Sequence, residues 1–224
     1  MDVILETRGI TKVYQEGQVK VVAVDSVNLV VERGRVLLIM GPSGSGKTTL
    51  LSMMGCILRP TSGEVYINGL CVSNLHEDAL PDIRKKYFGF VFQAFNLFPS
   101  LTAVENIEVV LRLKGWPKAS IRNDAVRLLK DVGLQRRAGF YPKDLSGGEK
   151  QRVAFARALA ADPAIILADE PTANLDSKTG REVLTLLREF AQTAGKAVVI
   201  ISHDPKSEEL AHRVVHLEDG MLKA

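Results

Sequence analysis

Residues 41–49, with the sequence GPSGSGKTT, are the segment best suited to chemistry. A glycine, four residues and then Gly-Lys-Thr is the spacing of a phosphate-binding loop, whose backbone N–H groups surround phosphate oxygens while the lysine reaches the outer phosphates. An apolar run, 36–40, precedes the loop and a helical pattern begins at Thr48, so the start of a helix adds its free N–H groups. The segment predicts a nucleoside triphosphate site, and its predicted contacts are Gly41, Pro42, Ser43, Gly44, Ser45, Gly46, Lys47, Thr48 and Thr49.

A pair of carboxylates follows a second apolar run, 164–168, and supplies further groups that triphosphate hydrolysis requires. Hydrolysis needs a magnesium ion, a group that orients water and positive groups around the transferred phosphoryl. The Thr48 hydroxyl and the Asp169 carboxylate are the predicted Mg²⁺ ligands, and Glu170 is the predicted general base. The alternative is that the pair only caps a turn, but the loop context, with Pro171 next, favours a site.

A third motif, LSGGEKQR, occupies residues 145–152. Ser146 and Glu149 have the spacing of a capping box at the start of a long helix. Gly147 and Gly148 lie between them, where the absence of side chains would let a bound anion approach the backbone closely. A well-capped helix without a ligand remains the alternative, and it explains the capping but not the double glycine.

The composition of the chain argues against several other classes of protein. The chain has 224 residues, 46% of them hydrophobic, which suits one domain or one domain with a subdomain. With 29 basic and 26 acidic residues, the net charge of +3 is too balanced to indicate nucleic-acid binding. Cys56 and Cys71 lack metal-ligand spacing and fit a reducing compartment. No apolar run approaches the roughly 18 residues of a membrane span, and residues 1–11 do not resemble a signal peptide, so we expect a soluble chain.

The hydrophobic patterns predict an α/β fold. Strands are expected at 4–14, 21–31, 35–40, 64–68, 164–168 and 197–201, and a hairpin near 214–221. Helices are expected at 48–58, 102–113, 119–132, from the LSGGEKQR motif to 161, and at 177–193. Short apolar strands that alternate with helices indicate a mainly parallel sheet covered on both faces. Residues 96–141 are interpreted as a helical subdomain inserted into this core.

The ordered set GPSGSGKTT, Gln93, LSGGEKQR, IILADEPT, Asp176 and His203 resembles the ATP-binding cassette ATPases over essentially the whole chain. The resemblance implies one domain, 1–224, with a phosphate-loop NTPase core and an N-terminal antiparallel β subdomain in 1–95 and 142–224, and the helical subdomain in 96–141. It implies ATP and Mg²⁺ as cofactors, with Lys47, Gln93, Glu170 and His203 as catalytic residues. Gln93 would join Thr48 and Asp169 at the metal.

The same resemblance assigns the remaining contacts. Tyr14 matches the aromatic residue that stacks on adenine, although an ordinary tyrosine at a strand end is the alternative. In this family Ser146, Gly147, Gly148 and Glu149 of one copy complete the phosphate site of a second, and the loop at Asp176 crosses between them. The resemblance therefore implies a head-to-tail homodimer with two ATP sites.

The runs at 89–107 and 167–176 are similar to the separate ATPases of the lipoprotein-release, macrolide-export and cyanobacterial glycolipid-export group. That branch implies an integral membrane permease partner, with a membrane-fusion or periplasmic partner, and a position on the cytoplasmic face of the inner membrane. Phe95, Leu97, Phe98 and Leu101 are expected to dock the permease, or to form subdomain core. An importer ATPase is the alternative, and a soluble cassette ATPase or a regulatory module without turnover fits less well.

Overall fold

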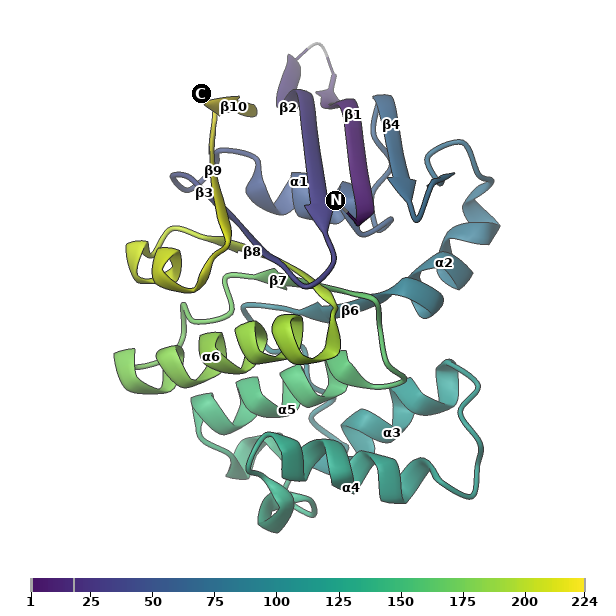
Figure 1. The fold of residues 1–224 in the computed structure, drawn as a ribbon, viewed down its shortest axis with the longest axis vertical. Coiled ribbons are helices and arrows are strands. Elements are labelled where there is room, and N and C mark those ends of the chain that lie inside the picture. Colours follow the sequence, from purple (N-terminus) through teal and green to yellow (C-terminus); the bar gives the residue numbers. More distant parts are fainter. Residues whose placement is uncertain (1, 18, 224) are drawn as a thin grey trace.

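The computed structural model describes residues 2–17 and 19–223. Its strands form two sheets (Figure 1). The larger sheet has the order β10 (Met221–Lys223), β9 (Arg213–Glu218), β3 (Val36–Met40), β8 (Ala197–Ser202), β7 (Ile165–Asp169), β6 (Phe88–Val91). The smaller sheet has the order β2 (Val19–Glu32), β1 (Val3–Glu16), β4 (Ser62–Ile67), β5 (Leu70–Cys71).

The five strands from β9 to β6 are parallel. All residues of β3 and β8 are buried, as expected for apolar strands covered on both faces. Among the described strands of the larger sheet, only β10 runs antiparallel to its neighbour. Asp219 and Gly220, both with positive φ, make the tight turn that joins it to β9. Because parallel strands end at one edge, the segments after β3, β8, β7 and β6 meet there.

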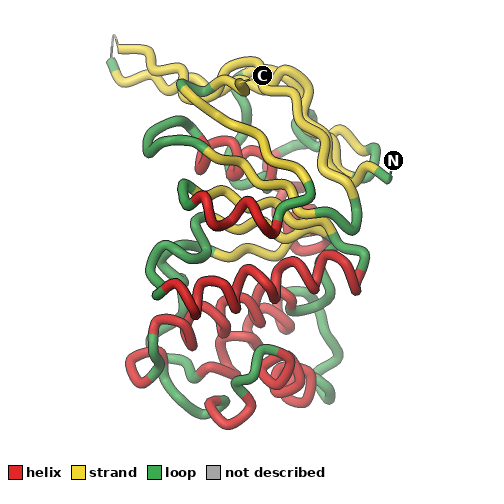
Figure 2. Tube along the Cα trace, turned by 60° about the vertical axis from the view of Figure 1, so that its left-hand side comes forward, coloured by secondary structure: helices red, strands yellow, loops and turns green. Residues whose placement is uncertain are grey.

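The helices are α1 (Lys47–Met54), α2 (Leu80–Tyr87), α3 (Ala103–Leu113), α4 (Ile121–Asp131), α5 (Gly147–Leu159) and α6 (Ser177–Ala194). Short 3₁₀ helices are η1 (Glu77–Ala79), η2 (Gln135–Arg137), η3 (Pro142–Asp144) and η4 (Pro205–Leu210). Figure 2 shows the strands gathered at one end of the molecule and most helices at the other. Among the described residues, no helix has both the length and the apolar character needed to cross a membrane.

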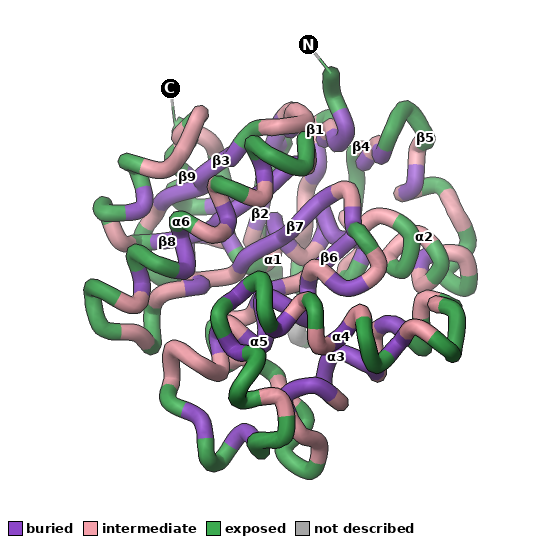
Figure 3. Tube along the Cα trace, turned by 60° about the horizontal axis from the view of Figure 1, so that its bottom comes forward, coloured by how far each residue is buried: buried purple, intermediate pink, exposed green. Residues whose placement is uncertain are grey.

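Two apolar cores lie on opposite faces of the larger sheet. One joins that sheet to α1 and the smaller sheet, and the other joins it to α3, α4, α5 and α6. Figure 3 shows the buried stretches along β3, β7 and β6, with exposed loops around them. The predicted mainly parallel sheet and antiparallel β subdomain are therefore confirmed.

The capping box predicted before the helix at 102–113 is present. The Glu105 N–H donates to the Thr102 hydroxyl oxygen at 3.4 Å, and the Thr102 N–H donates to the Glu105 carboxylate at 2.7 Å. The first predicted helix, 48–58, is too long, because α1 ends at Met54. A Cβ at Gly55 would lie only 2.7 Å from Leu167, and the chain then turns at Cys56 with a φ of +55°. Neither α2 nor β6 was expected from the sequence.

Candidate functional site

The phosphate-binding loop leaves β3 at the carboxyl edge of the larger sheet. Two of its glycines are enclosed by backbone from other elements: a Cβ at Gly41 would lie 2.1 Å from the Leu217 carbonyl oxygen, and one at Gly46 2.1 Å from that of Ala23. Gly46 also has a φ of +97° and is the N-cap of α1. The turn therefore needs glycine at both positions for its shape and its packing.

Lys47 lies folded over this loop. Its side chain is buried, and its ammonium donates to the carbonyl oxygens of Gly41 and Pro42, both at 2.8 Å. The Ser45 hydroxyl is also buried and has no hydrogen-bond partner within the described residues. Buried hydroxyls nearly always have a partner. An ammonium group and an unsatisfied hydroxyl in one loop are a chemical fit for an anionic ligand.

Thr48 and Asp169 lie together, as predicted for magnesium ligands. The Thr48 hydroxyl donates to Oδ1 of Asp169 at 3.4 Å. Burial raises the pKa of Asp169, the Thr48 hydroxyl opposes that rise, and the Glu170 carboxylate adds to it. Across residues 2–17 and 19–223, no three His, Cys, Asp or Glu side chains cluster as a metal site. Two oxygen ligands that need phosphate oxygens to complete the shell suit Mg²⁺.

Glu170 and His203 are brought together from the ends of β7 and β8. The Nδ1 atom of His203 lies 2.8 Å from Oε1 of Glu170, whose side chain is only 12% exposed, against 65% for His203. Glu170 has a φ of +44°, which is uncommon for a residue with a side chain and marks functional sites. Its N–H donates to the Ile201 carbonyl at 3.0 Å, which holds this conformation against β8.

Gln93 follows β6, the strand next to β7, and so begins at the same edge. Its side chain is exposed, and its backbone carbonyl accepts a hydrogen bond of 2.8 Å from the Asn174 amide. Asn174 belongs to the loop that runs from Glu170 to Asp176. The contact joins the loop after β6 to the loop after β7.

The predicted capping box of the LSGGEKQR motif is present at the start of α5. The Glu149 N–H donates to the Ser146 hydroxyl oxygen at 3.2 Å, and the Ser146 N–H donates to the Glu149 carboxylate at 2.8 Å. The latter bond is the main cause of the lowered pKa of Glu149. Arg137 also binds that carboxylate, at 2.9 Å.

The double glycine has a partly structural explanation. A Cβ at Gly148 would lie 2.2 Å from Cγ2 of Thr179 in α6, so the two helices touch there. A Cβ at Gly147 would have more room, since its nearest neighbour is the Asn174 carbonyl oxygen at 3.4 Å. Packing therefore accounts for Gly148 but does not demand glycine at 147.

Asp176 is the N-cap of α6. Its carboxylate accepts from the N–H groups of Lys178 and Thr179 at 3.0 and 3.1 Å and from the Thr179 hydroxyl at 2.7 Å. The bond from that hydroxyl is the first cause of its lowered pKa. Asp176 is exposed, so it stiffens the loop while leaving the loop accessible.

Tyr14 lies in the hairpin of β1 and β2. It pairs with Val21, two residues from Ala23, whose carbonyl touches Gly46 of the phosphate loop. Tyr14 is 44% exposed, and the Lys12 ammonium lies 5.5 Å from the centre of its ring. The hairpin thus carries an exposed aromatic residue near the place where it contacts the phosphate loop.

Comparison with known proteins identifies the family. The ABC transporter family matches residues 24–173. This chain belongs to that family. It is similar to an ABC transporter ATP-binding protein of Methanocaldococcus jannaschii, MJ0796, with 45% identity over 223 residues that cover 98% of this chain and 95% of that protein.

Similarity extends to a fused transporter and to solved structures. The macrolide export ATP-binding/permease protein MacB of Rhodopseudomonas palustris is 43% identical over 98% of this chain, which spans 34% of that protein. A dimeric post-hydrolysis structure of MJ0796 bound to ADP and Pi matches this fold with a TM-score of 0.92, 44% identity, and coverage of 99% and 97%. The predicted cassette fold and ATPase activity are confirmed.

Two residues of this ABC ATPase that the sequence analysis did not assign also contact the site loops. They are Asn174 and Gln151, whose side-chain amide donates to the Pro171 carbonyl oxygen at 2.7 Å. Gln151 is fully buried within the LSGGEKQR motif. Its helical spacing from the apolar residues Ala154, Phe155 and Ala158, which places it on their face of the helix, is the signal that could have revealed it.

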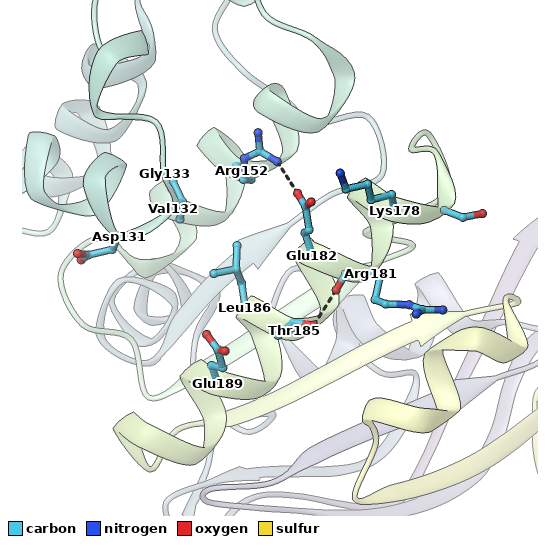
Figure 4. Close-up of a pocket in the computed structure, with 11 residues that line it drawn as sticks. Asp131, Val132, Gly133, Arg152, Lys178, Arg181, Glu182, Thr185, Leu186 and Glu189 are labelled. Carbon is cyan, nitrogen blue, oxygen red and sulfur yellow. Dashed lines mark hydrogen bonds and ion pairs between the residues drawn. The ribbon is translucent and has the colours of Figure 1, made fainter.

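A cleft of about 810 Å³ lies away from the phosphate loop, between the end of α4, α5 and the outer face of α6 (Figure 4). Its charged residues are of both signs, and Arg152 is already paired with Glu182 at 3.3 Å. No residue of the phosphate loop lines it. The cleft is therefore separate from the predicted phosphate site.

Proposed function

We propose that two copies of this ABC ATPase close head to tail around ATP and drive an export-type membrane permease. One observation carries the proposal: Glu170, held at 2.8 Å from His203, shares a sheet edge with the phosphate loop and Asp169. The dimeric structures of the similar MJ0796 support the pairing. One phosphate loop and one LSGGEKQR motif per chain then make two sites in a closed pair.

In this proposal the residues of the edge divide the work. Lys47 exchanges its two carbonyl partners for phosphate oxygens, and the loop N–H groups surround the rest of the triphosphate. Glu170 accepts a proton from the attacking water. His203 holds Glu170 in place through Oε1 and has an exposed ring with which to contact the terminal phosphate.

Thr48, Asp169 and Gln93 would hold Mg²⁺ beside the phosphates. When bound, the ion neutralises charge on the β and γ phosphate oxygens. Thr48 and Asp169 are already in contact, and Gln93 begins at the end of a neighbouring strand. Burial raises the pKa of Asp169, and a cation beside its carboxylate would stabilise the charged form.

Contacts with the second copy involve the exposed, well-capped starts of two helices. Ser146, Gly147, Gly148 and Glu149 would meet the partner's nucleotide, since α5 presents N–H groups at its start. Asp176 would lie at the interface on the loop that it anchors to the start of α6. Tyr14 would stack on adenine through its exposed ring.

The permease would bind an apolar groove of about 310 Å³ between β6, α3 and α5. Phe92, Phe98 and Leu113 line it, and Phe98 and Leu113 are 48% and 64% exposed. An apolar helical segment is the partner that suits such a groove. Leu97, by contrast, packs against the helical core, so of the four residues expected to dock the permease only Phe98 lines this groove.

Export is favoured by the similarity to MacB, a macrolide export ATP-binding/permease protein. We propose that residues 96–141 act as the permease-facing subdomain and that the ATPase sits on the cytoplasmic face of the inner membrane. A membrane-fusion protein would complete the machine. Adjacent genes for such a permease and fusion protein support this proposal, and an adjacent periplasmic binding protein contradicts it.

The Glu170→Gln variant tests the pairing. It should bind ATP, hydrolyse it poorly and form a dimer with ATP and Mg²⁺, measured by sedimentation velocity and phosphate release. Lys47→Ala should stay monomeric under the same conditions, because it lacks the phosphate contact. A Glu170→Gln protein that turns over normally, or that stays monomeric with saturating ATP beside its permease, contradicts the proposed function.

A further inference from the structure

One face of α5 packs against the loop and the helix that come after Glu170 in the chain. Gly148, Gln151 and Phe155 are spaced by three and four residues and so share that face. Gly148 touches Thr179, Gln151 binds the Pro171 carbonyl, and Phe155 packs edge-on against Phe190, with ring centres 6.4 Å apart. Gln151 is the polar member of this otherwise apolar seam.

The side chain of Gln151 fixes the position of a neighbouring loop, although one of its own polar atoms stays unsatisfied. Its side chain is fully buried, and its Nε2 donates to the Pro171 carbonyl oxygen at 2.7 Å. Its Oε1 is buried with no hydrogen-bond partner among the residues described. A buried unsatisfied acceptor is unfavourable, and an apolar side chain of the same size would avoid it but would leave the Pro171 carbonyl without its donor. The amide is therefore best explained by what it holds.

What it holds is the peptide between Pro171 and Thr172, one residue beyond Glu170. The Glu170 N–H is bound to the Ile201 carbonyl in β8, and the carbonyl of the following residue, Pro171, is bound by Gln151. Pro171 has no N–H and is buried, so this carbonyl is its only backbone hydrogen-bonding group. Glu170 thus sits, with its positive φ, between one contact to the sheet and one to α5.

The other end of α5 is also attached to a site loop. Arg157 is buried, and its guanidinium donates to the Phe95 carbonyl at 2.8 Å and to the Asn96 carbonyl. These residues follow Gln93 by two and three positions. One rigid helix therefore contacts the loop of Glu170, the loop of Gln93 and, at its start, the surface proposed for the second copy.

We propose that Gln151 is a positioning residue that links the start of α5 to the catalytic carboxylate. Ser146 and Gln151 are five residues apart, roughly 8 Å along the helix. A displacement of α5 when its start meets the partner's nucleotide would be transmitted to the Pro171 carbonyl and would re-place Glu170. ATP binding at one site would thus change the rate of hydrolysis at the other. This inference rests on the proposed head-to-tail function.

Gln151→Met is the direct test, because it keeps the length and the burial but removes the donor. Steady-state ATPase assays should give a kcat lower by about tenfold or more, since small misplacements of catalytic groups have such effects. The KM for ATP should stay within about twofold, because no phosphate contact is lost. The Hill coefficient should fall towards 1, while Tm should fall only modestly, because the lost bond to the Pro171 carbonyl is partly offset by removal of the unsatisfied Oε1.

Gln151→Glu supplies an independent readout. A buried carboxyl without a cation has a raised pKa and is protonated over much of the accessible pH range. Its O–H can then donate to the Pro171 carbonyl, whereas the carboxylate would repel that oxygen. The activity of Gln151→Glu relative to the natural protein should therefore be near normal at low pH and fall as pH rises. Gln151→Met should be low at every pH.

Val153→Ala is the matched control, since it shortens another buried side chain of α5. It should lower Tm without lowering kcat per folded molecule. Equal kcat and Hill coefficient in Gln151→Met and the natural protein, or a pH-independent Gln151→Glu, would overturn the inference. If Gln151→Met does not fold, the Gln151→Glu profile decides alone. Normal turnover in Glu170→Gln would instead reject the proposed function.

Discussion

His203 approaches Glu170 through Nδ1, at 2.8 Å from Oε1, although the two residues are 33 positions apart in the chain. The carboxylate is almost covered while the imidazole is mostly exposed. The histidine can therefore act on a ligand with one side of its ring while it orients Glu170 with the other. The contact exists because β7 and β8 are parallel neighbours that end together.

We expect His203→Ala to lower kcat by about 10²-fold, within the range for loss of a proton-transfer or orienting group. The Kd for ATP should change by less than about threefold, because the phosphate loop is untouched. Phosphate release and nucleotide titration measure the two quantities. His76→Ala, at an exposed position outside the site, is the control and should match the natural protein.

Lys47→Ala should weaken ATP binding by more than about tenfold, because a charge-assisted contact to phosphate is lost. The measurement is isothermal titration with ATP and Mg²⁺. Lys85→Ala removes an exposed lysine that pairs with Asp82 and should leave the Kd unchanged. Equal affinities for the two variants would reject the site.

Asp169→Asn should raise the stability of the nucleotide-free protein at neutral pH by on the order of 1 kcal/mol or less. Burial raises the pKa of Asp169 in the folded state, so the native protein holds its proton to higher pH than the unfolded chain. Stability is therefore lost as pH rises from the ordinary aspartate value, about 3.9, through the raised one.

The asparagine cannot ionise, so its advantage should disappear below about pH 4. Urea unfolding from pH 3.5 to 7.5 measures the difference between the two proteins. The variant should at the same time lose ATPase activity, because it lacks the carboxylate. A gain in stability that is equal at all pH values would contradict the assigned cause.

Gly148→Ala should destabilise the protein by about 1–3 kcal/mol, because its Cβ would overlap Cγ2 of Thr179. Adding Thr179→Ser removes that methyl group and keeps the hydroxyl that binds Asp176. Thermal unfolding of the double variant should recover most of the loss. ATPase activity should stay low if Gly148 also meets the second copy's nucleotide, and its full recovery would assign the glycine to packing alone.

Cys56 should react with iodoacetamide at pH 8 far more slowly than Cys71. Burial raises the pKa of the Cys56 thiol to about 11, so little thiolate forms, and the residue is covered. Peptide mass spectrometry after timed labelling measures both rates. Rapid labelling of Cys56 in the folded protein would contradict the buried position.

Much of the site was predictable because the motifs are short and local. The phosphate loop is defined by nine consecutive residues, and its strand and helix adjoin it. The capping boxes at Thr102 and Ser146 involve residues three positions apart, so the sequence alone shows them. The long strands and helices were predicted for the same reason, since their apolar period depends on near neighbours.

The sequence-based expectations were wrong where contacts with residues far along the chain decide the local structure. β6 was missed because its four residues become a strand only beside β7, and Gly89 is required there by the Ala158 carbonyl, 2.1 Å from where its Cβ would lie. The helix predicted to reach residue 58 ends at Met54, where Gly55 packs closely against Leu167 and Phe90 and Cys56 takes a left-handed φ of +55°. No local pattern contains either contact.

The sequence by itself determined the family, the phosphate loop and most helices and strands, because each depends on residue types at short spacing. Only the tertiary structure decided that Glu170 meets His203, that Gly148 packs on Thr179 and that Gln151 holds Pro171. Those relations follow from the strand order of the larger sheet and from the seam of α5 with the segment after Glu170. Both arise from pairing between segments far apart in the chain, which local preferences do not specify.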